Sequence, residues 1–403
     1  MASKGFIRLK TLAIFGGEPI FDRTLHVGRP NIGKREGFLE RVNDMLDSRW
    51  LTNNGRYVRE LELKLAEFLN VKHVVATSNA TVGLEILMRA LDLTGEVVLP
   101  SFTFVATAHA VQWLGLKPVF ADVNANTHHL DPTSVERMIT ANTSAILGVH
   151  VWGVASDLEA LADIAEHHNA HLLFDAAHAF GASYKGQMIG SFGGAEVFSF
   201  HATKFFNTFE GGAVTTKDDA LADRLRHMRN FGFSGYDTVD SVGINAKMSE
   251  VHAAMGLTLL EGLDDVIATN HANYHAYRDG LEDIPGLSLY TFDEAERNNY
   301  QYIVVSNDEE QSGISRDVLV DVLHAENVLA RRYFYPGCHQ MQPYSNLYPD
   351  AGLLLSKTER LTQQVLSLPN GTAVFRDDIA KICDIIRYTV SHGPEITKLL
   401  AKD

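Results

Sequence analysis

From about Val71 to Thr216 the sequence alternates short apolar runs, rich in β-branched residues, with stretches whose apolar residues recur at helical spacing. The first pair is "HVVATS" followed by "ATVGLEILMRAL", and the last apolar runs are "HLLFDAA", "AEVFSF" and "GGAVTT". Strands that alternate with helices form a mostly parallel sheet with helices on both of its faces. The alternation therefore predicts an α/β fold.

The pattern changes in the last third of the chain. A helical segment is predicted over residues 249–284, and it is followed by "YQYIVVS", "RDVLVDVLHAEN" and "FRDDIAKICDIIRYTVSHG", which suit an α+β unit. A chain of 403 residues exceeds what one core usually holds. We therefore predict a large domain over residues 1–260, with a loop-rich segment at about 1–50, and a small C-terminal domain over residues 261–403.

Composition narrows the range of partners. The formal net charge of −15 at pH 7 opposes binding to polyanions, so no nucleic acid is expected. The sequence has no run of 18 apolar residues, and residues 1–9 lack the apolar core of a signal peptide, so no membrane is expected. Only Cys338 and Cys383 are present, which favours a reducing, cytoplasmic location.

The stretch "FSFHATKFFNTFEGGAVTT" places Lys204 among five phenylalanines. A buried ammonium group is costly unless it is paired or neutralised. A lysine that loses its proton in such a place becomes a nucleophile for a carbonyl carbon. Alternatively, only the stem of Lys204 is buried and its ammonium reaches water.

Other chemical groups are expected at the carboxyl edge of the sheet, where open α/β sheets bind ligands. Asp175 ends the "LLFD" run and can hold a proton on a pyridine nitrogen, or cap the following turn. The backbone of Ala80 and the hydroxyls of Thr81 and Ser199 can bind an anion, although Thr81 also suits an ordinary helix cap. Phe104 follows "VVLP" and can stack on a ring or pack in the core.

In this order the motifs "NATVGLE", "PSFTFVAT", "FDAAHAFGA", "HATKFFNTFEGGA" and "RRYFYPGCH" resemble the nucleotide-sugar aminotransferases of the DegT/DnrJ/EryC1/StrS family, from about Gly28 to the last predicted helix. The resemblance implies a fold-type-I transferase that depends on pyridoxal 5′-phosphate. Lys204 would bond to the cofactor and then move the proton, and Asp175 would pair with its ring nitrogen. The remaining cofactor contacts would be His178 at the phenolic oxygen, Phe104 on the ring, and Ala80, Thr81 and Ser199 at the phosphate.

The resemblance also implies partners. Asn245, in "INAKMSE", would reach the cofactor phosphate of a neighbouring subunit, which makes the active unit a homodimer. The segment "RRYFYPGCH" would border the pocket for the nucleotide sugar, with Arg331, Tyr335 and His339 as substrate-binding residues. Glutamate would be the amino donor.

Three motifs indicate a subgroup of this family. "TFEGG" with Phe209, "HVGRPNIG" and "VHVWG" resemble members that act on TDP-4-keto-6-deoxyglucose and make the 4-amino-4,6-dideoxy sugar. Alternatives are a 3-keto nucleotide sugar, a GDP-linked sugar, or a non-catalytic regulator that binds the same cofactor. A branch with histidine in place of the lysine dehydrates sugars instead, and the presence of Lys204 disfavours it.

Two other classes of site have little support. The 18 histidines include the pairs His128-His129 and His167-His168, but no HExxH or CxxC spacing accompanies them, so no metal ligand is predicted. No GxGxxG follows a strand that opens a βαβ unit, which disfavours a dinucleotide-dependent dehydrogenase.

Overall fold

The computed structural model describes residues 9–401, so the expectations for residues 1–8 lie outside the described residues. A sheet of seven strands has the order β2-β10-β9-β6-β5-β3-β4, and of its strands only β10 runs antiparallel to its neighbours. The predicted α/β fold with a mostly parallel sheet is confirmed. The strands are β2 (His73–Thr77), β3 (Glu96–Pro100), β4 (Lys117–Ala121), β5 (Thr143–Val149), β6 (His171–Asp175), β9 (Ala195–Ser199) and β10 (Gly212–Thr216).

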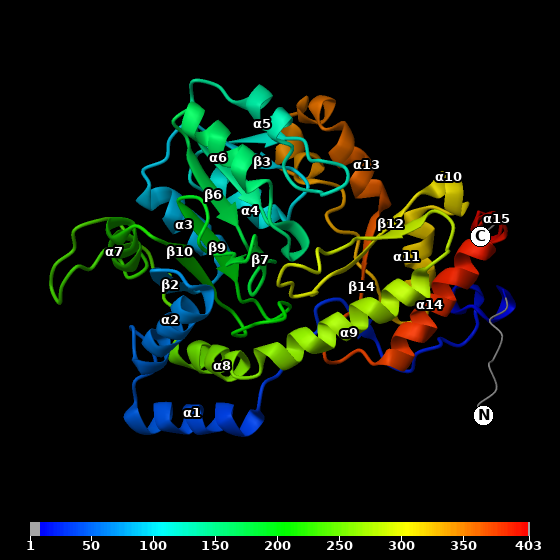
Figure 1. Cartoon of the computed structure of the whole chain (residues 1–403), viewed down its shortest axis with the longest axis horizontal. Helices are drawn as coiled ribbons and strands as arrows, with labels where there is room; N and C mark the ends of the chain where they lie inside the picture. Colours follow the sequence, from blue (N-terminus) through cyan, green and yellow to red (C-terminus); the bar gives the residue numbers. More distant parts are fainter. Residues whose placement is uncertain (1–8, 402–403) are drawn as a thin grey trace.

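Helices cover both faces of this sheet (Figure 1). On β3, Val97 and Leu99 join a core with three helices, while Val98 joins the core on the opposite face. This alternation follows from the two-residue period of a strand, and it explains why the parallel strands are apolar throughout. The first face carries α3 (Ala80–Ala90), α4 (Val105–Trp113) and α7 (Asp219–Met228), and the second carries α2 (Arg56–Leu69), α5 (Pro132–Met138), α6 (Leu158–His167) and α8 (Glu250–Leu260).

The helix predicted over residues 249–284 is two helices, α8 and α9 (Leu263–Leu281), which are separated at Glu261 and Gly262. A glycine costs about 1 kcal/mol in a helix interior, so the chain breaks readily there. The break lets α8 pack on α1 (Arg35–Ser48) and α2 while α9 packs on α14 (Arg376–Ser391). In Figure 1, α9 runs from the side of the large sheet to the C-terminal part of the chain.

The C-terminal part contains a three-stranded antiparallel sheet in the order β11-β12-β14. Its strands are β11 (Leu287–Leu289), β12 (Ile303–Asn307) and β14 (Val365–Leu368), and α9, α11 (Arg316–Ala325) and α14 share one apolar core with it. This matches the predicted α+β composition. The remaining elements are α10 (Glu309–Ser312), α12 (Tyr344–Leu347), α13 (Ser356–Gln364), α15 (Gly393–Leu400), the hairpin β7 (Ser183–Tyr184) and β8 (Gln187–Met188), and the pair β1 (Leu25–His26) and β13 (Val328–Leu329).

The N-terminal segment differs from the loop-rich expectation. Residues 35–48 form a 14-residue helix, α1 (Arg35–Ser48), which packs on α8. Before it, Leu12, Phe21 and Leu25 are buried in the core of the C-terminal part, and β1 pairs with β13. The segment therefore contacts both parts of the chain. A domain boundary near residue 260 remains a proposal, which the helix break at Gly262 supports.

Within residues 9–401, no helix combines the length and apolar character that crossing a membrane requires.

Candidate active site

The lysine predicted to react lies in the loop between β9 and β10. Phe200 and Phe206 are buried there, and Phe206 stacks on Phe180 with ring centroids 4.5 Å apart. The loop is closed by hydrogen bonds from the Thr208 amide to the Phe200 carbonyl and from the Phe200 amide to the Gly211 carbonyl. The phenylalanines thus anchor the loop by burial and fix the backbone that carries Lys204.

The Lys204 side chain enters the site rather than extending into solvent. Its Nζ donates a hydrogen bond to the Tyr302 hydroxyl at 3.1 Å, although the residue keeps partial exposure. Burial of the ammonium lowers the pKa of Lys204 to about 8, and the negative charge of Asp175 opposes that shift. At neutral to mildly basic pH, a substantial fraction of this amine is therefore neutral and nucleophilic.

Asp175 is the last residue of β6 and is buried. Its Oδ2 accepts a hydrogen bond from the Thr107 hydroxyl at 2.8 Å, and its Oδ1 accepts one from the Ala177 amide at 3.0 Å. Burial raises the pKa of Asp175, and these donors and the Lys204 ammonium partly oppose the rise. Asp175 caps the following turn and interacts with the charge of Lys204, and its pairing with a pyridine nitrogen stays a prediction.

His178 lies in a turn rather than on a helix, because the residues that directly follow β6 form turns. Its ring is buried, with its centroid 4.3 Å from that of Tyr302 and 6.0 Å from that of Trp152. Burial lowers the pKa of His178 well below its usual value, and the charge of Lys204 adds to the effect. The imidazole is therefore neutral, and its Nδ1 accepts a hydrogen bond from the Trp152 amide at 3.3 Å.

The three residues predicted to hold a phosphate converge at the start of α3. Ser199 lies opposite Gly212 in the ladder between β9 and β10. A side chain at Gly212 would lie 2.7 Å from the Ala80 amide nitrogen, so only glycine leaves that backbone free to approach a ligand. The Ala80 amide, the partly exposed Thr81 and Ser199 thus share one corner at the N-terminus of a helix, which favours anions.

Phe104 immediately precedes α4 and has 57% of its surface exposed, so it does not pack in the core. It follows β3 at the same sheet edge that Asp175 occupies on β6. The preceding aromatic, Phe102, is fully buried. The ring of Phe104 is therefore accessible for stacking on another ring, and it is not part of the core.

An aromatic wall beside Lys204 was not predicted. Tyr302 is buried behind the amine, and Trp152 packs against Tyr302 and stacks on Phe334 with centroids 5.3 Å apart. From the sequence, Tyr302 is only part of the strand-like "YQYIVVS", since nothing in its neighbourhood signals a partner about 100 positions away. The "VHVWG" motif was the only indication of Trp152.

Arg331 and Tyr335 are both exposed, and Arg331 lies near Tyr302. The Arg331 guanidinium is 5.3 Å from the centroid of the Tyr333 ring, and its charge opposes the rise in the pKa of Tyr302 that burial causes. Tyr335 is 41% exposed, with the Arg316 guanidinium 5.3 Å from its ring centroid. Both residues offer surface to a substrate.

His339 is a correction. It was the stronger predicted substrate ligand of the two in "RRYFYPGCH", yet it is 4% exposed. Its Nδ1 lies 2.7 Å from the Ser101 hydroxyl and its Nε2 lies 2.7 Å from a Glu359 carboxylate oxygen. Because both ring nitrogens have protein partners, the structure assigns His339 a structural role, and we do not propose it as a substrate ligand.

Asn245 is exposed and forms an isolated bridge with Asn230. Among residues 9–401 it has no hydrogen bond to Lys204, Asp175 or Ser199 of the same chain. The loop that follows α7 projects from the body of the molecule in Figure 1.

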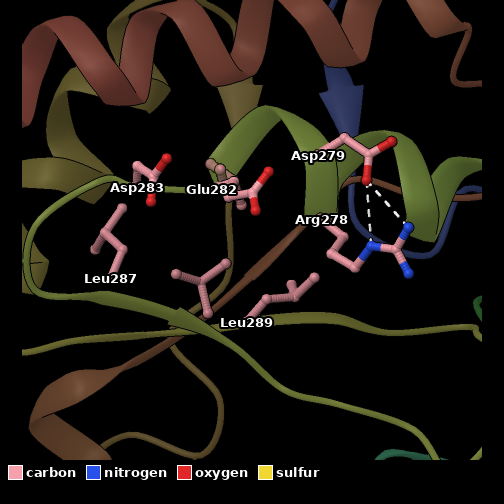
Figure 2. A pocket seen from close by; sticks show the side chains of 8 residues that line it. Arg278, Asp279, Glu282, Asp283, Leu287 and Leu289 are labelled. Carbon is pink, nitrogen blue, oxygen red and sulfur yellow. Dashed lines mark hydrogen bonds and ion pairs between the residues drawn. The ribbon is translucent and has the colours of Figure 1, made fainter.

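A separate hollow of about 530 Å³ lies between the end of α9 and β11 (Figure 2). Acidic and leucine side chains line it, and the Arg278 at its edge is paired with Asp279 at 3.1 Å. Its lining contains none of the residues predicted for the site, so this hollow is not the candidate active site.

The lysine, the buried carboxylate and the anion corner lie at the carboxyl edge of a mostly parallel sheet, which defines an α/β enzyme with an amine nucleophile. The family follows from comparison with known proteins. The chain belongs to the DegT/DnrJ/EryC1/StrS aminotransferase family, whose profile matches residues 33–387. The predicted family, fold and enzyme class are confirmed.

Individual relatives are similar over nearly the whole chain. A Shigella dysenteriae protein named dTDP-4-amino-4,6-dideoxy-D-glucose transaminase is 36% identical, over 91% of this chain and 99% of its own. An Escherichia coli protein of the same name is 34% identical, over 91% and 98%. A crystal structure of DesI in the presence of its TDP-sugar product superimposes with a TM-score of 0.93 at 48% identity, over 98% of this chain and 100% of that one.

Proposed function

We propose that this protein is a pyridoxal-phosphate-dependent aminotransferase that converts dTDP-4-keto-6-deoxy-D-glucose into the 4-amino-4,6-dideoxy sugar, with glutamate as amino donor. The observation that carries the proposal is the Lys204 amine, which points into the site to donate a hydrogen bond to Tyr302 and interacts with the charge of the buried Asp175 carboxylate. The names of the Shigella and Escherichia relatives and the TDP-sugar of DesI support the choice of sugar.

The donor set fits pyridoxal phosphate. A protonated ring nitrogen would give Asp175 the cationic partner that a buried carboxylate needs. The corner formed by Ala80, Thr81 and Ser199 suits a phosphate, and the exposed ring of Phe104 suits a flat heterocycle. When bound, the cofactor supplies an electron sink for the carbon that loses its proton.

Each residue of the candidate site has a distinct role in the proposed reaction. Lys204 would bond to the carbonyl carbon of the cofactor, with water leaving, and would take or return a proton; the Tyr302 hydroxyl holds its Nζ when the amine is free. Asp175 would keep the proton on the ring nitrogen. Trp152 and the neutral ring of His178 close the site with apolar surface, which excludes water. Arg331 supplies positive charge for a diphosphate.

A direct test mixes the purified protein, glutamate and dTDP-4-keto-6-deoxyglucose and follows the conversion of ketone to amine by mass spectrometry. We expect the 4-amino product, and no product with Lys204→Ala. A product aminated at C3 would contradict the regiochemistry alone. Faster conversion of a GDP-linked 4-keto sugar would contradict the nucleotide, and a Vibrio cholerae relative named GDP-perosamine synthase, 31% identical, makes that comparison necessary.

We propose that the active unit is a homodimer. The segment from Phe231 to Ile244 exposes apolar side chains, among them Tyr236 at 97% and Val242 at 83%, which is costly surface for a monomer. Asn245 stands at the end of this segment.

Mixed dimers test the role of Asn245. If Asn245 of one subunit serves the site of the other, Lys204→Ala and Asn245→Ala are each impaired as homodimers. Unfolding and refolding the two variants together then restores one intact site in each mixed dimer, or about a quarter of all sites. No recovery on mixing, with dimers present by light scattering, would contradict the shared site.

We propose that the protein is located in the cytoplasm. Cys338 and Cys383 are both free and buried, and burial raises the pKa of each thiol to about 12. Free thiols are typical of reducing compartments. Fractionation of cells that produce the protein tests this location.

A further inference from the structure

A cluster of three metal-ligand side chains lies away from the residues of the active site. His271 and His275 are one turn apart on α9, and their Nε2 atoms are 2.7 Å apart. Glu294, from the segment between β11 and β12, faces both rings. Its Oε2 is 3.5 Å from the His271 Nε2 and its Oε1 is 3.6 Å from the His275 Nε2. The three ligand atoms lie within 4.8 Å of one another.

We propose that His271, His275 and Glu294 bind a divalent transition-metal ion, Zn²⁺ in the case tested below. Two imidazole nitrogens and one carboxylate oxygen suit such an ion, whereas Mg²⁺ and Ca²⁺ require oxygen ligands. Zinc–ligand bonds of about 2.0–2.1 Å imply ligand separations of about 3.3 Å in a tetrahedron. The two distances to Glu294 join a different carboxylate oxygen to each ring, and both are close to that value. The two rings need to separate by only about 0.6 Å.

Neighbouring groups prepare the ligands. The Tyr300 hydroxyl donates a hydrogen bond to the Glu294 Oε2 at 2.9 Å, which orients the carboxylate as outer partners of metal ligands commonly do. The Tyr300 ring also packs on the His271 ring, with centroids 4.8 Å apart. The His275 Nδ1 is buried and has no hydrogen-bond partner among residues 9–401, so no group in that range fixes its tautomer from this side. That ring can present a lone pair at Nε2 to a metal.

The competing explanation is a hydrogen bond between the two imidazoles, in which one Nε2 donates to the other. It needs no ion, but it leaves Glu294 3.5 Å or more from both rings, beyond a good hydrogen bond. The HExxH and CxxC spacings do not describe this cluster. Its two histidines lie in "HANYH" on one helix, and its carboxylate lies 19 positions further along the chain.

A metal at this place would fasten the segment from Glu294 to Tyr302 to α9. The Asn270 side chain already donates to the Asn299 carbonyl at 3.0 Å, and Tyr302 at the end of the segment accepts the hydrogen bond from Lys204. The ion is therefore structural. It supports the element that carries Tyr302 and takes no part in amino transfer.

Metal analysis of the desalted holoenzyme tests the site. The protein is equilibrated with ZnCl₂, unbound metal is removed on a column, and zinc per chain is measured by mass spectrometry. We expect the wild type to hold one more equivalent than either His271→Ala or His275→Ala. Glu294→Gln should weaken binding at least about tenfold, because it removes the anionic ligand. The matched control is His168→Ala, a partly exposed histidine that also contacts a glutamate.

A second readout separates loss of the site from loss of the fold. Zinc should raise the Tm of the wild type and of the control, and leave the Tm of His271→Gln unchanged, since a ligand that binds the native state stabilises it. Equal zinc content in the wild type and all three ligand variants would overturn the proposal. So would wild-type affinity in Glu294→Gln.

Discussion

Two buried carboxylates on neighbouring strands have opposite roles. Glu196 on β9 is fully buried, and all of its hydrogen bonds come from fixed protein groups. Its Oε1 accepts from the amides of Gly190 and Phe192 at 2.9 and 2.6 Å, and its Oε2 lies 3.2 Å from the His150 Nε2. Such a carboxylate is satisfied without a ligand, so it is a structural group.

Asp175, at the end of the adjacent β6, has two neutral donors and an ammonium group nearby. That ammonium, on Lys204, donates to one neutral hydroxyl within the described part of the chain. Burial shifts the pKa of both groups toward their neutral forms. Burial of charge therefore does not identify an active site by itself. We propose that Lys204 and Asp175 are the functional pair because their partners leave the charge incompletely compensated.

The largest expected effect comes from Lys204→Ala. It removes the nucleophile and the proton carrier together, so transamination should fall by about 10⁴-fold or more. The free energy of unfolding should change little, because a costly buried ammonium is lost with it. Steady-state assays and chemical denaturation measure the two quantities. Lys185→Ala, an exposed lysine paired with Glu159, is the control and should leave activity unchanged. Equal activity in the two variants would contradict the assignment.

The opposite pattern is expected for Glu196→Ala, which leaves His150 buried without its partner. Each buried donor that loses its acceptor costs about 1–3 kcal/mol, and the Gly190 and Phe192 amides lose theirs as well as His150, so the free energy of unfolding should fall by about 3 kcal/mol or more. The kcat per folded molecule should stay close to that of the wild type. Glu136→Ala breaks an exposed contact with His168 and should cost about 1 kcal/mol or less. A loss of kcat larger than the loss of folded protein would refute the structural role of Glu196.

Asp175→Asn keeps the shape of the side chain and removes its charge. We expect kcat to fall by about 10²–10³-fold, because the ring nitrogen loses its anionic partner. The negative charge of Asp175 raises the pKa of Lys204, which burial has lowered to about 8. The neutral amine of the wild-type apoprotein should therefore increase as pH rises through about 8, and in the variant this midpoint should lie at lower pH. The rate of cofactor uptake against pH measures it. An unchanged midpoint would show that the two groups are not coupled.

The smallest effect is expected for Tyr302→Phe, which removes the hydrogen bond that the Lys204 amine donates to the Tyr302 hydroxyl. A hydrogen bond to a charged group contributes about 1.5–3 kcal/mol, so kcat should fall about tenfold or somewhat more. The ring and its contacts with Trp152 and His178 remain. Tyr333→Phe, in the same aromatic wall, serves as the control. An unchanged kcat and pH profile in Tyr302→Phe would reduce Tyr302 to a packing residue.

Local patterns predicted most of the fold, and they singled out Lys204 and Asp175, whose charges interact in the structure. The alternating strands and helices between Val71 and Thr216 were predicted because the spacing of apolar residues within each short segment indicates its secondary structure. The break at Gly262 was missed because a single glycine is compatible with a continuous helix, and the choice depends on which surfaces α8 and α9 cover. His339 was misjudged because its partners, Ser101 and Glu359, come from distant segments.

The sequence by itself determined the order of the strands along the chain, the place of Asp175 at a strand end, and the presence of a lysine in an apolar loop. Tertiary structure decided which charges are compensated. Glu196 receives donors from its surroundings, whereas Lys204 meets the hydroxyl of Tyr302 from the C-terminal part of the chain. The physical reason is that periodicity is a property of neighbours in sequence, while desolvation and hydrogen bonding depend on every group that folding brings within a few ångströms.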